Sequence, residues 1–356
     1  MNFEIDSAGE IRKGETIDLV SLNKYLKKIL ADKIVEIKQY GGGFSNLTFE
    51  LITPGKSYVL RKPPAGAKEI KGGHDMAREF GLLQKIASAG FQKVPKAIHL
   101  CENEEIIGDI FYVMEKVDGI ILRANDALQF AKEIPESSIR KLSEAICREQ
   151  AKLHLIDIEE TGLIEIGKPD GYVRRQIVGW IKRYLASQTD PIQDMVDIFT
   201  WLEDELPEST HQSLIHNDYK YDNLVLNARN ITEIKAILDW EMTTVGDPLM
   251  DLGATLAYWT EAGDESFTKQ FNLSWVKGNL TRKEYTEMYS ELTGFDTSNI
   301  LFYYVFGLFK NAVIIQQIYY RYHKGFTNDP RFKNLIYGVK VLAKKAVKSI
   351  QSGELK

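Results

Sequence analysis

A short polar segment and one later carboxylate hold the side chains best suited to chemistry. His216, Asp218 and Asn223 follow the spacing H-x-D-x4-N, and Asp239 lies sixteen residues after Asn223, directly behind an apolar run. Phosphoryl transfer uses one carboxylate to orient a hydroxyl nucleophile, and an amide oxygen with a second carboxylate to hold Mg²⁺. The spacing therefore predicts a phosphoryl-transfer site.

The residue types in this segment divide the work between metal binding and proton chemistry. Magnesium prefers hard oxygen ligands and keeps some of its waters, so one or two protein oxygens suffice beside the ATP phosphates. Asn223 offers a neutral oxygen, which avoids crowding a third carboxylate against an anionic nucleotide. Asp218 is then left to accept the substrate proton or to aim its hydroxyl. We therefore expect Asn223 and Asp239 to bind the metal.

The composition narrows the class of protein. A chain of 356 residues can bury a large core and suggests two domains or lobes. The net charge of −5, without a block of like charges, argues against a nucleic-acid partner. Cys101 and Cys147 lack metal-ligand spacing and favour a reducing compartment. The N-terminal stretch lacks the apolar core of a signal peptide, and the longest apolar run stops at Lys310 after half a membrane span, so we expect a cytoplasmic protein with no membrane partner.

The first third of the chain predicts a helix followed by a sheet. Apolar residues at helical spacing from Leu19 to Ile29 indicate an amphipathic helix, with Asp18 or Ser21 as its cap. Strand-like runs follow, and we expect them to form a five-stranded antiparallel sheet. The runs cover residues 34–40, 47–52, 58–61, 96–101 and 110–115.

The turn between the first two runs is rich in glycine. Gly42 and Gly43 would let the backbone approach a phosphate closely, and Ser45 and Asn46 would add hydrogen-bond donors. The alternative is an ordinary hairpin turn, because the sequence GGGFSN departs from the G-x-G-x-x-G of protein kinases. We include these four residues in the expected nucleotide site.

A possible phosphate clamp follows the turn. The third run ends at Arg61, where protein kinases place the lysine that pairs with phosphates, and the next helix offers Glu79 as its partner. The guanidinium fork can pair with phosphate and carboxylate alike, although it is bulkier than an ammonium group. Lys62 is the alternative cation for this role. The alternative is that Arg61 and Glu79 are two ordinary charged side chains in contact with solvent.

The fifth run ends where an adenine-binding hinge would lie. Its residues 111–114 are apolar, and the chain then turns abruptly polar. In a kinase-like fold the backbone of Glu115 and Val117 would hydrogen-bond adenine. The alternative is an ordinary strand that leaves the sheet.

The remainder of the chain is mainly helical in pattern. We expect one helix to end near His154 and others to cover residues 172–187 and 192–206. Further helices should begin near Glu265, Arg282, Ile300 and Arg331.

A hairpin and a helix start surround the polar segment. Residues 224–226 and 234–238 are expected to pair as strands, with Asn223 at one end and Asp239 at the other. Pro248 at a first helical position predicts a helix capped by Asp247. One turn later, Asp251 is expected to bond back to the polar segment.

These motifs together resemble the aminoglycoside phosphotransferase superfamily of small-molecule kinases. The similarity is greatest to the kinase domain found in acyl-CoA dehydrogenase family members 10 and 11 and their stand-alone bacterial relatives. It is carried by stretches such as GGGFSNLT, YVLRKPP, LIHNDYKYDNLVL and AILDWEMTTVGDPLMDLG. The resemblance implies an α+β, two-lobed, protein-kinase-like fold. Residues 1–116 would form the nucleotide-binding lobe, and residues 117–356 a mostly helical catalytic and substrate-binding lobe with a catalytic-loop hairpin.

The resemblance also implies a role for each residue of the polar segment. Asp218 would be the catalytic base or the residue that orients the hydroxyl, while Asn223 and Asp239 would bind Mg²⁺. His216 would brace the loop around Asp239 without proton chemistry. Lys220 would neutralise charge near the γ-phosphate. Relatives commonly have Gly at the position of Asn217, which leaves the loop geometry open.

The expected activity is ATP- and Mg²⁺-dependent transfer of the γ-phosphoryl group to a hydroxyl of a small molecule. The resemblance suggests a hydroxy acid or hydroxyacyl-CoA as acceptor, and a monomer or homodimer as the active form. An anionic acceptor would suit a basic helix that otherwise is a solvated face; its cations are Arg174, Arg175, Lys182 and Arg183.

Three other functions are alternatives to this one. The acceptor is alternatively an aminoglycoside or macrolide antibiotic, or a sugar or choline-type alcohol. A nucleotide-binding pseudokinase is disfavoured because Asp218, Asn223 and Asp239 are all present. A metal hydrolase is disfavoured because no second His lies at ligand spacing from His216.

Overall fold

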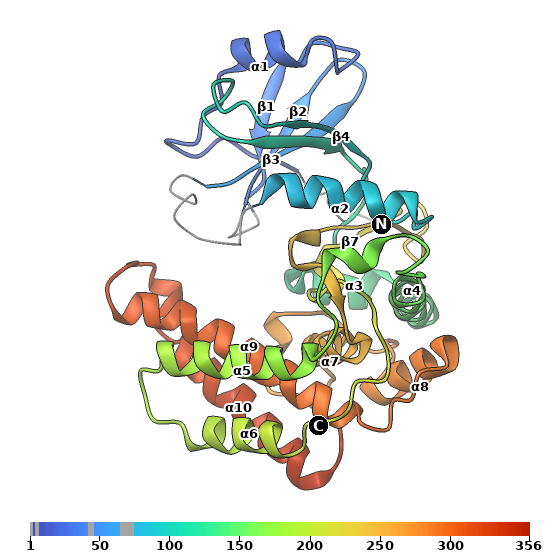
Figure 1. The fold of residues 1–356 in the computed structure, drawn as a ribbon, viewed down its shortest axis with the longest axis vertical. Helices are drawn as coiled ribbons and strands as arrows, with labels where there is room; N and C mark the ends of the chain where they lie inside the picture. The colour runs from blue at the N-terminus through green and yellow to red at the C-terminus, as the bar shows by residue number, and fades with distance from the viewer. Residues whose placement is uncertain (1–2, 4–6, 42–45, 65–74) are drawn as a thin grey trace. The chain divides into compact units, whose positions relative to one another are not determined.

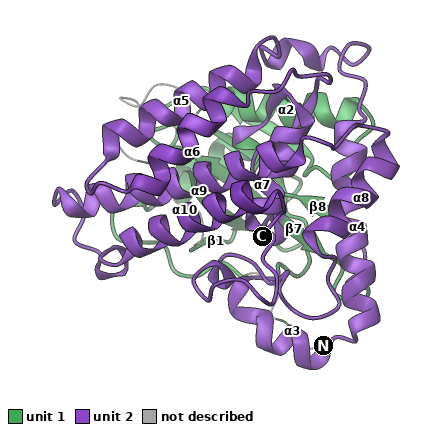
Figure 2. Cartoon of the chain, turned by 90° about the horizontal axis from the view of Figure 1, so that it is seen from below, with its two compact units in different colours: residues 1–121, 224–230, 234–241 green, residues 122–223, 231–233, 242–356 purple. Residues whose placement is uncertain are grey.

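The computed structural model describes residues 3, 7–41, 46–64 and 75–356. The chain divides into two compact units, which are coloured separately in Figure 2. Unit 1 comprises residues 1–121, 224–230 and 234–241, and unit 2 comprises residues 122–223, 231–233 and 242–356. Each unit is therefore assembled from segments that are separated in the sequence.

Unit 1 is built on a five-stranded antiparallel sheet with strand order β1-β2-β3-β5-β4 (Figure 1). Alternating strand residues place apolar side chains such as Phe49 and Leu51 in a buried core. The predicted antiparallel sheet is confirmed. Its strands are β1 Glu36–Gln39, β2 Leu47–Ile52, β3 Ser57–Lys62, β4 Ala97–Cys101 and β5 Phe111–Glu115.

In the described part of unit 1, two helices and a hairpin accompany the sheet. Helix α1, Leu19–Leu26, begins at the predicted cap Asp18, whose carboxylate accepts a hydrogen bond from the Val20 amide at 2.9 Å. Helix α2, Met76–Ser88, is capped in the same way by Asp75. The hairpin consists of β7 Leu224–Leu226 and β8 Ile234–Ile237, paired antiparallel with Leu224 opposite Ile237.

Unit 2 is mostly helical, and its central helix is α9, Ile300–His323, which packs against α7, α10 and α5. Two short strands, β6 Ser213–Ile215 and β9 Thr244–Gly246, pair beside them and were not predicted. The other helices are α3 Ala127–Glu133, α4 Glu136–His154, α5 Tyr172–Ser187, α6 Gln193–Asp204, α7 Pro248–Tyr258, α8 Arg282–Thr293 and α10 Leu335–Ser352.

Helices α7 and α9 approach each other closely at two glycines. A Cβ atom on Gly253 would lie 2.3 Å from the Tyr303 carbonyl oxygen, and one on Gly307 would lie 2.5 Å from the Gly253 carbonyl oxygen. Any larger residue would force the helices apart. In the described part of the chain, α9 is also the one helix long and apolar enough to span a membrane, with 78% of its most apolar stretch buried. Core helices pass the same test, so this is weak evidence for a membrane.

The helix predicted from Glu265 is wrong. The structure has a single 3-10 turn there, η6 Thr268–Gln270, followed by irregular backbone. The Asn272 carboxamide oxygen accepts from the Leu273 amide at 2.7 Å, and the Ser274 hydroxyl donates to the Thr260 carbonyl at 2.9 Å. The Asn272 bond is local and competes with the helical pattern, whereas the Ser274 bond ties the segment to backbone fourteen residues earlier.

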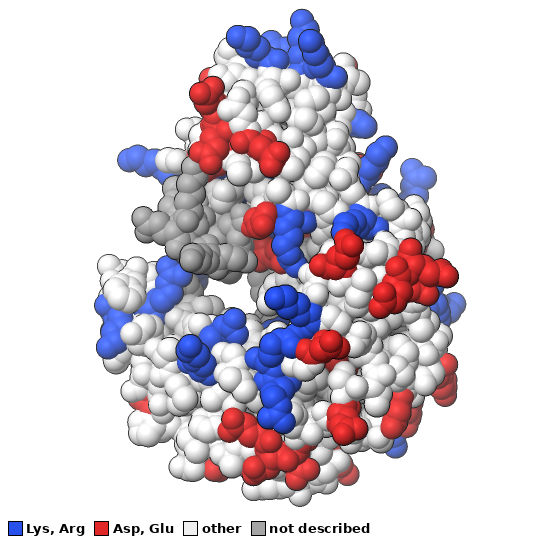
Figure 3. Space-filling view, viewed as in Figure 1, with Lys and Arg blue, Asp and Glu red and all other residues white. Residues whose placement is uncertain are grey.

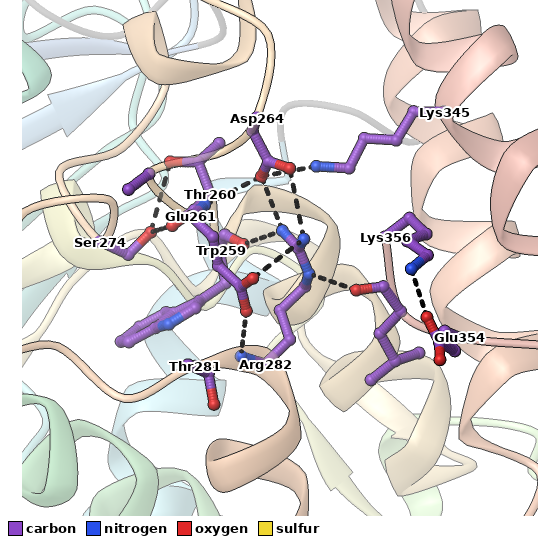
Figure 4. Close-up of polar contacts among 12 residues, drawn as sticks. Trp259, Thr260, Glu261, Asp264, Ser274, Thr281, Arg282, Lys345, Glu354 and Lys356 are labelled. Carbon is purple, nitrogen blue, oxygen red and sulfur yellow. Dashed lines mark hydrogen bonds and ion pairs between the residues drawn. The ribbon is translucent and has the colours of Figure 1, made fainter.

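Arg282, the first residue of α8, anchors this irregular segment through a buried ion network (Figure 4). Its Nη1 donates to Asp264 Oδ2 at 2.7 Å and to the Trp259 carbonyl at 2.9 Å. The Lys345 ammonium of α10 lies 2.6 Å from the same Asp264 oxygen. Burial would raise the pKa of the Asp264 carboxyl, but Arg282 and Lys345 outweigh it and hold that pKa at about 2.

We expect Asp264→Asn to destabilise the protein at pH 7 by about 3–5 kcal/mol, because buried Lys345 loses its carboxylate partner and buried Arg282 keeps only Glu261, at 3.4 Å. The folded-state pKa of Asp264 is below its ordinary value of 3.8, so its stabilisation is complete above about pH 4 and is lost as the pH falls toward 2. Urea unfolding of both proteins across this range should show the difference in unfolding free energy narrowing. A difference that does not change with pH contradicts the assignment.

Candidate active site

Arg61, near the end of β3, contacts three carboxylates from two other segments of unit 1. Its Nη1 donates to Glu79 of α2, and its Nη2 lies 3.3 Å from oxygens of both Asp239 and Glu241. The Tyr112 hydroxyl donates to the same Glu79 oxygen at 2.8 Å. The Arg61 side chain is 10% exposed and that of Glu79 is 3% exposed. The pairing of Arg61 with Glu79, suggested by the sequence, is present.

The alternative cation, Lys62, lies in a different contact. Its ammonium is 2.7 Å from Asp109. Successive strand residues point to opposite faces of a sheet, so only one of the two cations can face Glu79. Arg61 is that residue, and it is also the one that contacts Asp239.

The charge balance around Arg61 favours an added cation. Burial would lower the pKa of the guanidinium, but Tyr112 and the three carboxylates raise it. A second guanidinium, that of Arg78, donates to the Glu241 carbonyl at 3.1 Å, which still leaves three carboxylates beside two guanidinium groups. The described residues include no cluster of three or more His, Cys, Asp or Glu arranged to hold a metal ion by itself. A magnesium ion that takes most of its ligands from phosphates and water fits this donor set.

Two residues of the predicted site have a strained backbone. Among the described residues other than glycine, Asn217 and Asp239 have positive φ, 67° in each case. This left-handed region disfavours side chains with a Cβ atom, although Asn and Asp tolerate it best. The same constraint would account for the Gly that the family resemblance implies at position 217. Backbone strain of this kind gathers at functional sites.

The predicted base, Asp218, lies in unit 2 in the loop that follows β6. The Asn223 amide nitrogen donates to its Oδ2 at 3.0 Å and to its carbonyl at 2.8 Å, and the Lys220 ammonium lies 3.0 Å from Oδ2. Burial would lower the pKa of Lys220, but Asp218 and, less strongly, Tyr258 and Asp222 raise it. The structure therefore brings three predicted site residues together, with Lys220 protonated beside Asp218.

A buried carboxylate, Asp251 of α7, holds the backbone of this loop. It accepts hydrogen bonds from the His216 amide at 3.1 Å, the Asn217 amide at 2.6 Å and the His154 ring at 2.9 Å. Burial would raise its pKa, but His154 and His216 lower it, so the carboxylate stays ionised. The predicted bond from Asp251 back to the loop is confirmed. Asp247 caps α7 as predicted, accepting from the Leu249 amide at 2.8 Å.

His216 is fully buried and supports the loop rather than facing outward. Its Nδ1 accepts a hydrogen bond from the Asp218 amide at 3.2 Å. This contact fits a bracing role without proton chemistry. The predicted role of His216 around Asp239 stays a prediction.

Sequence reasoning missed Lys310 and Tyr172, which also contact the loop. The Lys310 ammonium of α9 donates to the Asn217 carbonyl at 2.9 Å, and the Tyr172 hydroxyl of α5 donates to the Asn217 side chain at 3.3 Å. The Asn217 amide nitrogen donates to the Met242 carbonyl at 3.0 Å. The available signal was a lysine inside the apolar run of a core helix, which requires a polar partner.

The remaining predicted nucleotide contacts are distributed along unit 1. Gly42, Gly43 and Ser45 lie outside the described residues. The Asn46 side chain donates to Glu241 at 2.9 Å. Their phosphate-binding role stays a prediction.

The predicted hinge lies at the end of β5. The Glu115 amide donates to the Lys96 carbonyl at 2.9 Å, within the sheet. Val117 follows in a segment without regular structure. The backbone therefore leaves the sheet between these two residues.

The basic side chains of α5 are partly occupied by contacts within unit 2. Arg175 donates to the carbonyls of Lys168 and Asp170, and Arg183 stacks over Trp180 at 4.7 Å from the ring centroid. On the face seen in Figure 3, Lys and Arg lie in several separate groups, and many Asp and Glu side chains lie in groups of their own. These contacts reduce the number of α5 cations available to a ligand.

A kinase-like phosphotransferase is the class that this fold and loop define. Residues 36–285 match the model of the family described as "Phosphotransferase enzyme family", so the chain belongs to that family. The kinase-like fold predicted from the sequence is confirmed by the solved structures that share it.

Known relatives agree with this assignment. Acyl-CoA dehydrogenase family member 10 of Mus musculus is 32% identical over 334 residues, which are 90% of this chain and 30% of that protein. A putative aminoglycoside phosphotransferase from Ralstonia eutropha is 28% identical with a TM-score of 0.81, covering 95% of this chain and 99% of that one. The streptomycin–ATP–APH(2")-IIa ternary complex shares the fold at 13% identity and a TM-score of 0.55, covering 94% and 96%. The chain spans less than half the length of the curated relatives it matches.

The positive φ at Asn217 predicts an unusual order of substitution effects. Asn217→Gly and Asn217→Ala both lose the side-chain bonds to Met242 and Tyr172, but only Gly adopts a φ of 67° without strain. We expect the Ala variant to be less stable than the Gly variant by about 1 kcal/mol in urea unfolding. An Ala variant as stable as the Gly variant contradicts this.

Proposed function

We propose that the protein catalyses Mg²⁺-dependent transfer of the γ-phosphoryl group of ATP to a hydroxyl of a small molecule, a hydroxy acid or hydroxyacyl-CoA. The observation that carries the proposal is the arrangement around Asp218. Its carboxylate is held by Asn223 and Lys220, and its backbone is fixed by His216. A carboxylate fixed in this way and still 18% exposed can orient an incoming hydroxyl.

Positioning and charge neutralisation supply most of the catalysis in this proposal. The transition state of phosphoryl transfer is loose and spreads charge over the phosphoryl oxygens. Asp218 aims the acceptor hydroxyl and takes its proton. Lys220, whose ammonium lies 3.0 Å from Asp218 and is kept charged by it despite burial, offsets charge near the transferred group.

The metal and nucleotide are assigned to the remaining polar residues. Bound Mg²⁺ would neutralise phosphate charge, and Asn223 and Asp239 are the proposed ligands. In the sequence these two residues flank the strands that pair Leu224 with Ile237. The negative balance around Asp239 supports a divalent cation there.

Arg61 would pair with the ATP phosphates while Glu79 fixes its guanidinium. The backbone at Glu115 and Val117 would contact adenine, and the segment from Gly42 to Asn46 would cover the phosphates. The ATP in the complex with APH(2")-IIa, which shares the fold, supports ATP as the donor.

The acceptor class is supported by the relatives. The mouse relative is named for acyl-CoA dehydrogenation, and this chain matches only 30% of its length. A kinase region joined to a protein of that name is expected to act on the same class of acyl compound. A hydroxyl on such a compound is the group that Asp218 would aim.

The proposal predicts turnover that depends on Asp218. With Mg²⁺ and ATP, the protein should form ADP in the presence of hydroxy acids or their CoA thioesters, and Asp218→Ala should lower kcat about 10²- to 10⁴-fold. A coupled ADP assay over a panel that also includes choline and an aminoglycoside measures this. The variant should keep wild-type thermal stabilisation by ATP with Mg²⁺. Wild-type protein that turns over no acceptor above the variant contradicts the proposed function.

Metal binding is tested separately at Asp239. Asp239→Asn should lose most of the Mg²⁺-dependent part of the ATP-induced rise in Tm, because one carboxylate ligand is removed. Asp109→Asn is the matched control, since Asp109 also pairs with a cation, Lys62 at 2.7 Å, but lies outside the proposed site. Equal Mg²⁺ dependence in wild type and Asp239→Asn rules out Asp239 as a ligand.

A further inference from the structure

Lys310 is a buried cation in the middle of α9, the long and mostly buried central helix of unit 2. Its side chain is 6% exposed, and its neighbours in α9 form the packed core against α7 and α5. Burying an ammonium group is costly unless it is paired. A Leu or Met would pack at this position without that cost. Packing alone therefore does not explain a lysine at this position, and its ammonium group must pair with a specific polar group.

That partner is the peptide group joining Asn217 to Asp218. A peptide group is planar, so fixing its oxygen and its hydrogen fixes its orientation. Lys310 donates to the oxygen, the Asn217 carbonyl, at 2.9 Å. The hydrogen, on the Asp218 amide, is donated to His216 at 3.2 Å. The oxygen and the hydrogen of the peptide group that precedes Asp218 are thus both held by side chains.

The preceding peptide group is held from another helix. The Asn217 amide donates to Asp251 of α7 at 2.6 Å, so α7 and α9 hold the two sides of one left-handed residue. The paired glycines Gly253 and Gly307 set the distance between those helices. The direction in which Asp218 leaves the loop is therefore defined by these two helices.

The charges around Lys310 keep its ammonium directed at the loop. Asp218 and Asp251 attract it, while Lys220 and Arg183 repel it, and the Trp180 ring lies 5.8 Å away. Burial lowers the pKa of Lys310 against the two carboxylates. The ammonium is thus attracted by Asp218 in the loop and by Asp251 of α7, which itself bonds to the loop.

We propose that Lys310 is a positioning residue for Asp218, acting through the Asn217 carbonyl. The proposal rests on the phosphoryl-transfer function above. It assigns to α9 a part in catalysis without contact between Lys310 and the acceptor.

The kinetic test compares Lys310→Met with Lys310→Arg. Lys310→Met should lower kcat about 10- to 100-fold, the equivalent of one lost charge-assisted hydrogen bond, with the KM for ATP unchanged. Lys310→Arg keeps a charged donor and should recover part of the loss. Lys345→Met is the matched control, because Lys345 is 8% exposed and pairs with Asp264 away from the loop. Equal losses of kcat in both Met variants would overturn the proposal.

A second measurement does not depend on activity. Hydrogen exchange by mass spectrometry should show faster exchange of amides in residues 214–222 in Lys310→Met than in wild type, and no such change in Lys345→Met. Unchanged exchange of this segment in Lys310→Met overturns the positioning role even if the protein is an active kinase. If wild-type protein shows no turnover, the proposed function is contradicted. If Lys310→Met nevertheless exchanges faster, the contact between Lys310 and the loop is supported.

Discussion

The loop that carries Asp218 depends on its contact with the buried carboxylate of Asp251. This carboxylate is ionised in a fully buried position because the two backbone amides and the His154 ring all direct hydrogens toward it. Removing any one of these donors would leave a buried charge less well solvated. The loop and helix α7 are therefore stabilised together, and neither can move without cost to the other.

In each unit, a charged side chain of the candidate site is held by side chains of opposite charge. In unit 1, the Arg61 guanidinium is surrounded by carboxylates, and in unit 2 the Asp218 carboxylate lies beside the Lys220 ammonium. Each group that would meet a ligand is thus held in place by a charge of opposite sign. In the proposed function, a phosphate or metal ion that binds here would exchange one charged partner for another. This lowers the reorganisation required on binding.

Local signals in the sequence predicted the parts of the fold that depend on near neighbours. Short strand-like runs predicted the sheet, and Asp18 and Asp247 predicted the starts of their helices because a cap acts within one turn. The pairing of Arg61 with Glu79 followed from their order along the chain. Lys310 and Tyr172 were missed because their partner, Asn217, is 93 and 45 residues away and is reached only through helix packing. The helix expected at Glu265 is absent because Asn272 bonds to the adjacent amide, and Ser274 bonds to the Thr260 carbonyl fourteen residues earlier.

The division of unit 1 among separate segments has a consequence for the order in which the protein is made. The chain passes between the units several times, and the last segment of unit 1 ends at residue 241. Arg61 and Glu79 emerge from the ribosome long before Asp239, which is 178 residues after Arg61. During synthesis the β-sheet can form early, but its charged cluster stays incomplete until about two thirds of the chain has emerged. The helices α3 to α6 must therefore be synthesised while Arg61 still lacks two of its carboxylate partners.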